Sequence, residues 1–273
     1  MKSETLVIKF GGNAMTDLTV KTNVVEQVKK LSEKGHKIVL VHGGGPFITK
    51  MLEIGGIQSE FVDGLRKTDE ESIKYIEMAL KGEVNGEIVR LLNAAGANAV
   101  GLSGKDGRTV TAVKRRHELL GNSGSKYVDL GLVGDAAAVD TTLLMLLLDN
   151  NFIPVVAPIA MGDDGMNYNI NADSFAGAVA AALNADHYIV LTDVDGILRD
   201  KNDPDSLINE ISLDNAVNEI GKSVQGGMIP KVQSCLHALQ NGVDNAHILN
   251  GTKADTLIDK FINSKNCGTK IFK

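Results

Sequence analysis

The chain has few of the residues that build disulfide frameworks and metal clusters. Only 2 of its 273 residues are cysteines, Cys235 and Cys267, and they lie far apart in the sequence. Since no set of nearby thiols and histidines accompanies them, the sequence predicts no disulfide scaffold and no cysteine-based metal site. We expect both thiols to be chemically inert.

Positive charge and long apolar runs are also scarce. The formal net charge is −6, and the only basic run, 114–117, is interpreted as a solvated turn. Binding to nucleic acid or to a membrane surface depends on clustered Lys and Arg, so neither partner is expected. The longest apolar run, 143–148, is too short to span a membrane and predicts a buried helix. A charged, glycine-containing turn begins within ten residues of Met1 and leaves no room for a signal peptide, so we expect a cytoplasmic protein.

What the sequence does contain is a regular alternation of apolar strand-length runs and helical patterns. Strands are expected at 6–10, 38–41, 99–102, 153–158, 188–191, 247–249 and 270–272. Helices are expected at 20–34, 46–53, 69–81, 84–95, 139–148, 174–183 and 230–240. This alternation predicts an α/β fold with a mainly parallel sheet covered on both faces. The segment 102–132 is rich in Gly, Lys, Arg and Ser and predicts hairpins and loops over one end of the sheet.

Two of the predicted strands end in glycines and are followed by helical patterns. The strand at 6–10 contains Lys9 and precedes Gly11 and Gly12, and the strand at 38–41 precedes His42 and the triplet 43–45. Glycines at a strand end let backbone N–H groups approach an anion, and the positive end of the next helix faces the same place. The pattern therefore indicates phosphate binding, although both glycine groups could also be tight strand-to-helix turns.

Neither glycine group matches a common nucleotide fingerprint. In the Walker pattern the lysine follows the glycines, whereas Lys9 precedes them. In a dinucleotide site a third small residue is needed where Ile48 stands, so close packing of helix and strand is excluded.

A loop at 63–71 carries a candidate carboxylate-binding arginine. Thr68 and Glu71 have the spacing of a capping box, which predicts a helix start and places Arg66 just outside it. A guanidinium presents paired donors in one plane and can bind a carboxylate with both. The alternative is an ordinary surface arginine.

The segment 167–173 carries three short polar side chains at alternating positions. In an extended conformation Asn169, Asn171 and Asp173 lie on one side of the chain. Asp173 also precedes a helical pattern rich in small residues, which we expect to lie tightly against a neighbouring backbone. Helix capping by Asp173 is an alternative that explains the aspartate but leaves both asparagines unexplained.

Two further segments place polar residues near the expected ligand edge of the sheet. Thr192 and Asp193 end the strand at 188–191, where open α/β sheets bind ligands, although a plain turn is the alternative. Lys231 lies in the first turn of the helix that follows Gly226 and Gly227, where positive charge opposes the macrodipole. An anion bound there would explain this placement.

These residues form an inventory suited to phosphoryl transfer, which needs charge neutralisation and alignment more than covalent chemistry from the protein. If the acceptor is a carboxylate, it is already deprotonated and needs no general base. The absence of an obvious catalytic histidine agrees with such an acceptor.

The sequence resembles the amino acid kinase family in six motifs. They are Lys9-Phe10-Gly11-Gly12, Val41-His42-Gly43-Gly44-Gly45-Pro46, Gly64-Leu65-Arg66-Lys67-Thr68-Asp69, Asn169-Ile170-Asn171-Ala172-Asp173, Leu191-Thr192-Asp193-Val194-Asp195-Gly196 and Gly226-Gly227-Met228-Ile229-Pro230-Lys231. The resemblance implies a three-layer αβα sandwich. It implies that 1–178 binds N-acetyl-L-glutamate and carries the dimerisation surface, and that 179–273 binds MgATP.

The resemblance also implies roles for individual residues. Lys9 and Lys231 would neutralise the transferring phosphoryl group, with Asp173 orienting both ammonium groups. Gly11, Gly12 and Gly44 would donate backbone N–H groups to phosphate oxygens and to the reacting end of the acceptor. The acceptor would be held by Gly44, Gly45, Arg66 and Asn169, and the nucleotide would also meet Thr192 and Asp193. Magnesium would be held mainly by ATP, so no protein metal ligand is named.

Related functions remain open at this point. The chain begins almost at its first strand and lacks the N-terminal helix of arginine-inhibited relatives, so we expect a homodimer that is insensitive to arginine. One alternative is a kinase of a related acceptor such as carrier-bound aminoadipate, against which the motif at 64–69 argues. The other is a catalytically silent sensor of nucleotide or amino acid on the same fold, against which Lys9, Asp173 and Lys231 argue.

Overall fold

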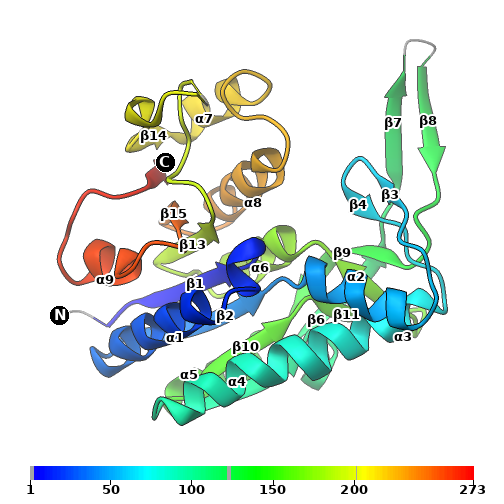
Figure 1. The fold of residues 1–273 in the computed structure, drawn as a ribbon, viewed down its shortest axis with the longest axis horizontal. Coiled ribbons are helices and arrows are strands. Elements are labelled where there is room, and N and C mark those ends of the chain that lie inside the picture. The colour runs from blue at the N-terminus through cyan, green and yellow to red at the C-terminus, as the bar shows by residue number, and fades with distance from the viewer. Residues whose placement is uncertain (1–2, 122–123, 201) are drawn as a thin grey trace.

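The structure is a computed structural model that describes residues 3–121, 124–200 and 202–273, and an eight-stranded sheet lies at its centre (Figure 1). The strand order is β14-β16-β15-β13-β1-β2-β10-β5. In this order the strands cover Glu210–Ser212, Thr269–Phe272, Asn245–Asn250, His187–Thr192, Thr5–Phe10, Lys37–His42, Ile153–Ala157 and Ala99–Ser103. Neighbours are parallel except β15 and β16, which are antiparallel. The predicted mainly parallel sheet is confirmed.

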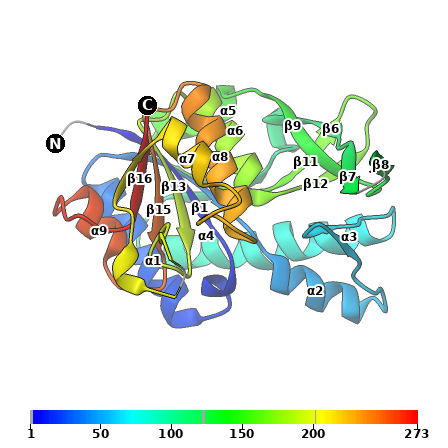
Figure 2. The ribbon, with the colours of Figure 1, turned by 90° about the horizontal axis from the view of Figure 1, so that it is seen from above.

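Helices cover both faces of this sheet. Figure 2 shows α1 (Leu18–Glu33), α4 (Asn85–Ala94) and α9 (Thr256–Phe261) on one face. The other face carries α5 (Thr142–Asp149), α6 (Ala172–Ala182) and α8 (Met228–Gln240), with α7 (Leu213–Glu219) beside α8. Alternate residues of β1 serve the two layers, since Leu6 and Ile8 join one core and Val7 joins the other. The predicted three-layer αβα sandwich is therefore confirmed.

A smaller β-rich region lies beyond one end of the sheet. Four strands close into a small barrel, namely β6 (Val110–Lys114), β9 (Val133–Val139), β11 (Ile159–Gly162) and β12 (Asn167–Ile170). Two hairpins accompany it in Figure 1, β3 (Phe61–Val62) with β4 (Leu65–Arg66), and β7 (His117–Gly121) with β8 (Gly124–Val128). Short 3₁₀ turns cover Asn13–Met15, Asp106–Arg108 and Pro204–Ser206. The hairpins predicted for 102–132 are confirmed.

The helical region after β4 differs from the sequence prediction of two separate helices at 69–81 and 84–95. Instead of two helices with a break, α3 (Ser72–Glu77), a π-helical segment (Met78–Val84) and α4 form one continuous helix, which follows α2 (Gly45–Ile54) and β4 in the chain. A π turn inserts an extra residue into the helix and often marks a functional site. Several elements are absent from the sequence prediction, namely α7, α9, β14 and the strands β3, β4, β9 and β11 of the smaller β-rich region.

Two further expectations need correction. The helix predicted for 139–148 begins only at Thr142, because Val139 ends β9 and Asp140 accepts a hydrogen bond from the Thr142 N–H at 2.9 Å. That helix is also only half-buried, since Leu144 is buried but Leu146 is 60% exposed. The basic run at 114–117 joins β6 to β7, with Lys114 and Arg116 exposed, which agrees with the predicted solvated turn.

Within the described ranges, no helix is both long enough and apolar enough to cross a membrane. Both cysteines are free, and burial raises the pKa of the Cys235 thiol, which keeps it in its unreactive protonated form.

Candidate active site

The site is built around one buried carboxylate, Asp173, in the first turn of α6. Its Oδ1 lies 3.0 Å from Nζ of Lys9 on β1. Its Oδ2 accepts a hydrogen bond from Nζ of Lys231, in the first turn of α8, at 3.2 Å. The three side chains are 5%, 6% and 18% exposed for Lys9, Asp173 and Lys231. Three elements far apart in the sequence thus converge on one ion-pair cluster.

The start of α6 explains why Asp173 is free to make these contacts. Asn171 caps the helix, because its side-chain oxygen accepts hydrogen bonds from the N–H groups of Asp173 and Ser174 at 2.9 and 3.2 Å. The alternative that Asp173 is the cap is therefore wrong, and capping does explain one of the two asparagines. The simple strand alternation is also wrong beyond Ile170, where β12 ends.

The tight helix packing expected from the small residues of α6 brings Lys231 within reach. A Cβ at Gly177 would lie only 3.0 Å from the backbone oxygen of Ser234 on α8. This close approach of α6 and α8 sets the distance between Asp173 and Lys231.

Burial and charge act in opposite directions on the cluster. Burial raises the pKa of Asp173, but the ammonium groups of Lys9 and Lys231 lower it by more, so its net pKa lies below the ordinary value. Burial lowers the pKa of Lys9, and the second lysine lowers it further while Asp173 opposes both. Two ammonium groups share a single carboxylate, so one positive charge of the cluster is not neutralised. An anion bound between the two lysines would neutralise it.

A cavity of about 280 Å³ opens beside this cluster. Its lining contains seven of the predicted site residues, namely Lys9, Gly12, Gly44, Gly45, Arg66, Asn169 and Asp173. Gly11 lies under the lysine rather than on the cavity wall, since a Cβ at Gly11 would come within 2.6 Å of Lys9 Nζ. The cavity has the size of a small-molecule site with one positively charged wall.

Arg66 also lines this cavity and is buried. Its guanidinium donates hydrogen bonds to the Ser59 and Thr49 hydroxyls, the latter at 2.8 Å, and to the Gly45 carbonyl at 3.3 Å. The ring of Phe61 lies 4.5 Å from the guanidinium carbon. The alternative of an ordinary surface arginine is excluded.

The predicted capping box next to Arg66 is not formed. The Thr68 hydroxyl donates to the Arg66 carbonyl at 3.0 Å, and Asp69 accepts from the Ser72 N–H at 2.7 Å instead. Arg66 is the last residue of the hairpin strand β4 and does not precede a helix N-terminus directly. The Thr68 hydroxyl therefore binds the backbone of this strand instead of capping a helix.

Thr192 is the last residue of β13, the strand beside β1, and Asp193 follows it; neither lines the first cavity. Thr192 is buried and donates a hydrogen bond to the exposed Asp193 at 3.3 Å. A second cavity of about 550 Å³ begins next to them and extends to the start of α8, and it is lined by Val194, Gly196, Ile197, Leu198, Arg199, Asp200, Lys222, Ser223, Gln225 and Met228. Val194, Gly196 and Met228 belong to motifs that carry the family resemblance, whereas the other seven were not predicted from the sequence. The glycines and basic residues flanking the predicted strand end were the available signal.

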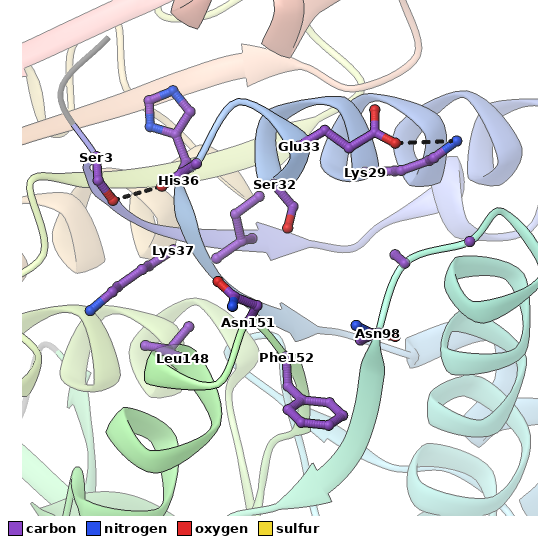
Figure 3. Close-up of a pocket in the computed structure, with 14 residues that line it drawn as sticks. Ser3, Lys29, Ser32, Glu33, His36, Lys37, Asn98, Leu148, Asn151 and Phe152 are labelled. Carbon is purple, nitrogen blue, oxygen red and sulfur yellow. Dashed lines mark hydrogen bonds and ion pairs between the residues drawn. The ribbon is translucent and has the colours of Figure 1, made fainter.

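A third cavity, of about 330 Å³, lies at the opposite end of the sheet (Figure 3). Its lysines are already paired, Lys29 with Glu33 at 3.6 Å and Lys37 with Asp149 at 2.7 Å. It lies where β1 and β2 begin, whereas open α/β sheets bind ligands where the strands end. The described part of the chain holds no group of three or more His, Cys, Asp or Glu side chains suited to a metal ion.

Comparison with known proteins agrees with this architecture. Residues 4–250 match the model of the amino acid kinase family. The chain is 45% identical to the acetylglutamate kinase of Heliobacterium modesticaldum, over 99% of this chain and 92% of that protein. It is 44% identical to the acetylglutamate kinase of Methanocaldococcus jannaschii, over 97% of this chain and 89% of that protein.

A solved structure resembles the whole chain. N-acetylglutamate synthase from Neisseria gonorrhoeae, complexed with coenzyme A and N-acetyl-glutamate, superposes with a TM-score of 0.83 and 26% identity, over 100% of this chain and 60% of that one. The matched motifs and the fold give one conclusion: the chain belongs to the amino acid kinase family.

Proposed function

We propose that the protein transfers the γ-phosphoryl group of MgATP to the γ-carboxylate of N-acetyl-L-glutamate, the second step of arginine biosynthesis. The similarity to acetylglutamate kinases over nearly the full chain supports this substrate. The observation that carries the proposal is the sharing of Asp173 by Lys9 and Lys231, at 3.0 and 3.2 Å, beside a glycine-lined cavity.

In the proposed reaction the two lysines neutralise charge on the migrating phosphoryl group, and Asp173 holds both ammonium groups in place. Gly11, Gly12 and Gly44 donate backbone N–H groups to phosphate oxygens and to the reacting carboxylate. The γ-carboxylate is already ionised near pH 7, because carboxyl groups ordinarily titrate near pH 4. No general base is needed.

The acceptor would lie in the smaller cavity, with its other carboxylate near Arg66 and its amide near Asn169. The nucleoside would lie in the larger cavity beyond Thr192 and Asp193, and Mg²⁺ would enter with ATP as part of the substrate. This arrangement assigns acceptor binding to 1–178 and nucleotide binding to 179–273, with α6 and α8 meeting between them. The free thiols suit the cytoplasmic location that we propose for the enzyme.

We also propose a homodimer formed through the N-terminal part. Strand β5 is the outermost strand on its side of the sheet. The side chains of Lys81, Asn93 and Asp106 already bind backbone groups on its outer edge, so we expect the protomers to meet through exposed side chains rather than by strand pairing. The exposed Leu146 and Met145 of α5 add apolar surface in the same part of the chain. Light scattering coupled to gel filtration tests this proposal, and a monomer at micromolar concentration would contradict it.

The activity is tested by ATP-dependent hydroxamate formation with N-acetylglutamate, glutamate, aspartate and carrier-bound aminoadipate as acceptors. The proposal predicts product only, or far more rapidly, with N-acetylglutamate. Faster turnover of carrier-bound aminoadipate would favour the related kinase. Binding of ATP and N-acetylglutamate without formation of ADP would favour a catalytically silent sensor.

A further inference from the structure

His42 lies fully buried at the end of β2, directly before the glycine triplet that lines the first cavity. Its Nδ1 is 2.8 Å from the carbonyl oxygen of Gly43. Its Nε2 is 3.0 Å from the side-chain nitrogen of Asn85, which begins α4 immediately after the π-helical segment. Both ring nitrogens therefore have a partner, and the imidazole joins the glycine loop to the helix.

The surroundings of Asn85 fix which ring nitrogen of His42 carries the proton. Asn85 Nδ2 also lies 2.9 Å from the Val155 carbonyl and 3.4 Å from the Leu102 carbonyl. Carbonyl oxygens only accept, so the amide nitrogen and not the amide oxygen faces them, and its two hydrogens are donated to the two nearer acceptors, the Val155 carbonyl and His42 Nε2. Nε2 is then the acceptor, and the proton on Nδ1 is donated to the Gly43 carbonyl.

This assignment requires a neutral imidazole, and the burial of His42 supplies it. Burial lowers the pKa of His42 to about 4, the hydrogen bond to Gly43 opposes the change, and Lys81 lowers the pKa further. Lys81 comes from the π-helical segment, donates to the Gly101 carbonyl at 2.8 Å and pairs with Asp106 at 3.2 Å. A protonated ring would turn an N–H toward the Asn85 amide nitrogen and break that contact.

The hydrogen bond to Gly43 controls the direction of the next backbone N–H. The carbonyl of Gly43 and the N–H of Gly44 belong to one planar trans peptide, so they point in opposite directions. With the carbonyl held by His42 behind the loop, the Gly44 N–H faces away from the ring, and Gly44 lines the cavity. The Gly43 N–H is fixed separately by the Phe10 carbonyl at 2.8 Å.

The π-helical segment supports the same loop from the side. A Cβ at Gly44 would lie 2.5 Å from Leu80 Cδ2 and 3.5 Å from Val84 Cγ2. The loop is thus confined by two side chains of this segment, and the following residue, Asn85, sets the tautomer of His42.

We propose that His42 and Asn85 are positioning residues that aim the Gly44 N–H at the oxygen on which charge develops during phosphoryl transfer. The inference rests on the proposed function. It assigns to His42 a role without proton transfer, as the neutral donor that sets the plane of the Gly43–Gly44 peptide.

Two substitutions of His42 separate its two hydrogen bonds. Asparagine can place an N–H near the position of Nδ1 and keep the bond to Gly43, whereas glutamine reaches the position of Nε2 and keeps only the contact with Asn85. We expect His42→Gln to lower kcat roughly 10- to 100-fold with little change in the Kd of N-acetylglutamate, and His42→Asn to stay within about threefold of wild type. His36→Gln, at another buried histidine near the start of β2, is the matched control and should leave kcat unchanged.

The outcomes separate this inference from the proposed function. If wild type forms no product from ATP and N-acetylglutamate, the proposed function fails. If wild type is active and His42→Gln equals it, or if the two His42 variants lose turnover equally, the positioning role is wrong and the function stands.

A second measurement keeps the inference testable if a variant does not fold. Nitrogen-15 NMR of the wild-type histidines should show His42 protonated on Nδ1 and unprotonated on Nε2 from pH 6 to pH 8. A proton on Nε2, or a charged ring in this range, would overturn the assignment.

Discussion

The ends of β1 and β2 share one sequence pattern and use it in different ways. Each is a buried parallel strand with a basic residue near its end and glycines directly after it. Lys9 has the Asp173 carboxylate 3.0 Å away, so its positive charge is compensated in the interior. His42 meets a carbonyl and an amide instead, and burial leaves it neutral.

The difference shows that the partner of a buried basic group, and not its burial alone, decides what it contributes. In the proposed reaction the end of β1 supplies positive charge for phosphate, and the end of β2 supplies oriented backbone N–H groups. Substitutions and changes of pH that act on one of these two strand ends should therefore have different effects.

The largest effect is expected where the charge compensation is removed. Asp173→Asn leaves two ammonium groups facing one another, so we expect a loss of about 3–5 kcal/mol in the free energy of unfolding and a large loss of kcat. Urea unfolding at pH 7 measures the first effect. The control Asp149→Asn, which breaks an exposed pair with Lys37, should cost less than about 1 kcal/mol. Equal losses in the two variants would contradict the central role of the cluster.

The neutral state of His42, at the end of β2, is tested by measuring stability as the pH is lowered. The unfolded chain binds a proton at His42 near pH 6.5, but the folded chain does so only near pH 4. Between these values the unfolded state holds more protons, so stability falls as the pH falls, by about 3 kcal/mol in total for this group. Unfolding curves at pH 7, 5.5 and 4.5 should show this dependence in wild type and lose the His42 share in His42→Asn. His237→Asn, at an exposed histidine, is the control and should retain the wild-type dependence; a His42→Asn curve parallel to wild type would refute the assignment.

In the proposed reaction Lys231, the second lysine of the charged cluster, stabilises the transition state. Lys231→Ala should lower kcat about 100-fold, because one electrostatic contact to the migrating phosphoryl group is lost. Steady-state kinetics with saturating ATP and N-acetylglutamate measures this effect. Lys265→Ala removes a surface lysine paired with Asp259 and should leave kcat unchanged. Equal turnover for wild type and Lys231→Ala would remove this lysine from the mechanism.

The smallest expected effect concerns the acceptor side of the cavity. Arg66→Lys keeps the charge but loses the paired planar donors, so the KM for N-acetylglutamate should rise about tenfold while kcat changes less. Arg108→Lys, in an exposed pair with Asp163, is the matched control. An unchanged KM would place the acceptor carboxylate elsewhere.

Much of the fold could be predicted because its strands are short apolar runs bounded by glycines and polar turns. Both faces of β1 and β2 are buried, so their sequences are nearly continuous apolar runs instead of alternating apolar and polar residues. The glycine groups, Lys9 and Lys231 also stand out locally, because their placement is unusual without an anion.

The remaining features depend on contacts between distant segments. The pairing of Asp173 with both lysines follows from the packing of α6 against β1 and α8, which no local pattern contains. The environment of Arg66 depends on its hydrogen bond to Thr49 on α2, which precedes it by 17 residues. Helix α9 covers only Thr256–Phe261, and the residue before it, Asp255, has a φ of 61° and makes no capping hydrogen bond with its side chain. The sequence therefore contains neither a long helical pattern nor a capping signal for this helix.

A crystal structure with MgADP, aluminium fluoride and N-acetylglutamate, which together mimic the phosphoryl group in transfer, would show directly which groups contact it. We predict that Nζ of Lys9, Nζ of Lys231 and the N–H of Gly44 all lie within about 3 Å of the fluoride or oxygen atoms around aluminium. A complex in which either lysine points away from this group, or in which the group binds outside the cavity beside Asp173, would contradict the account.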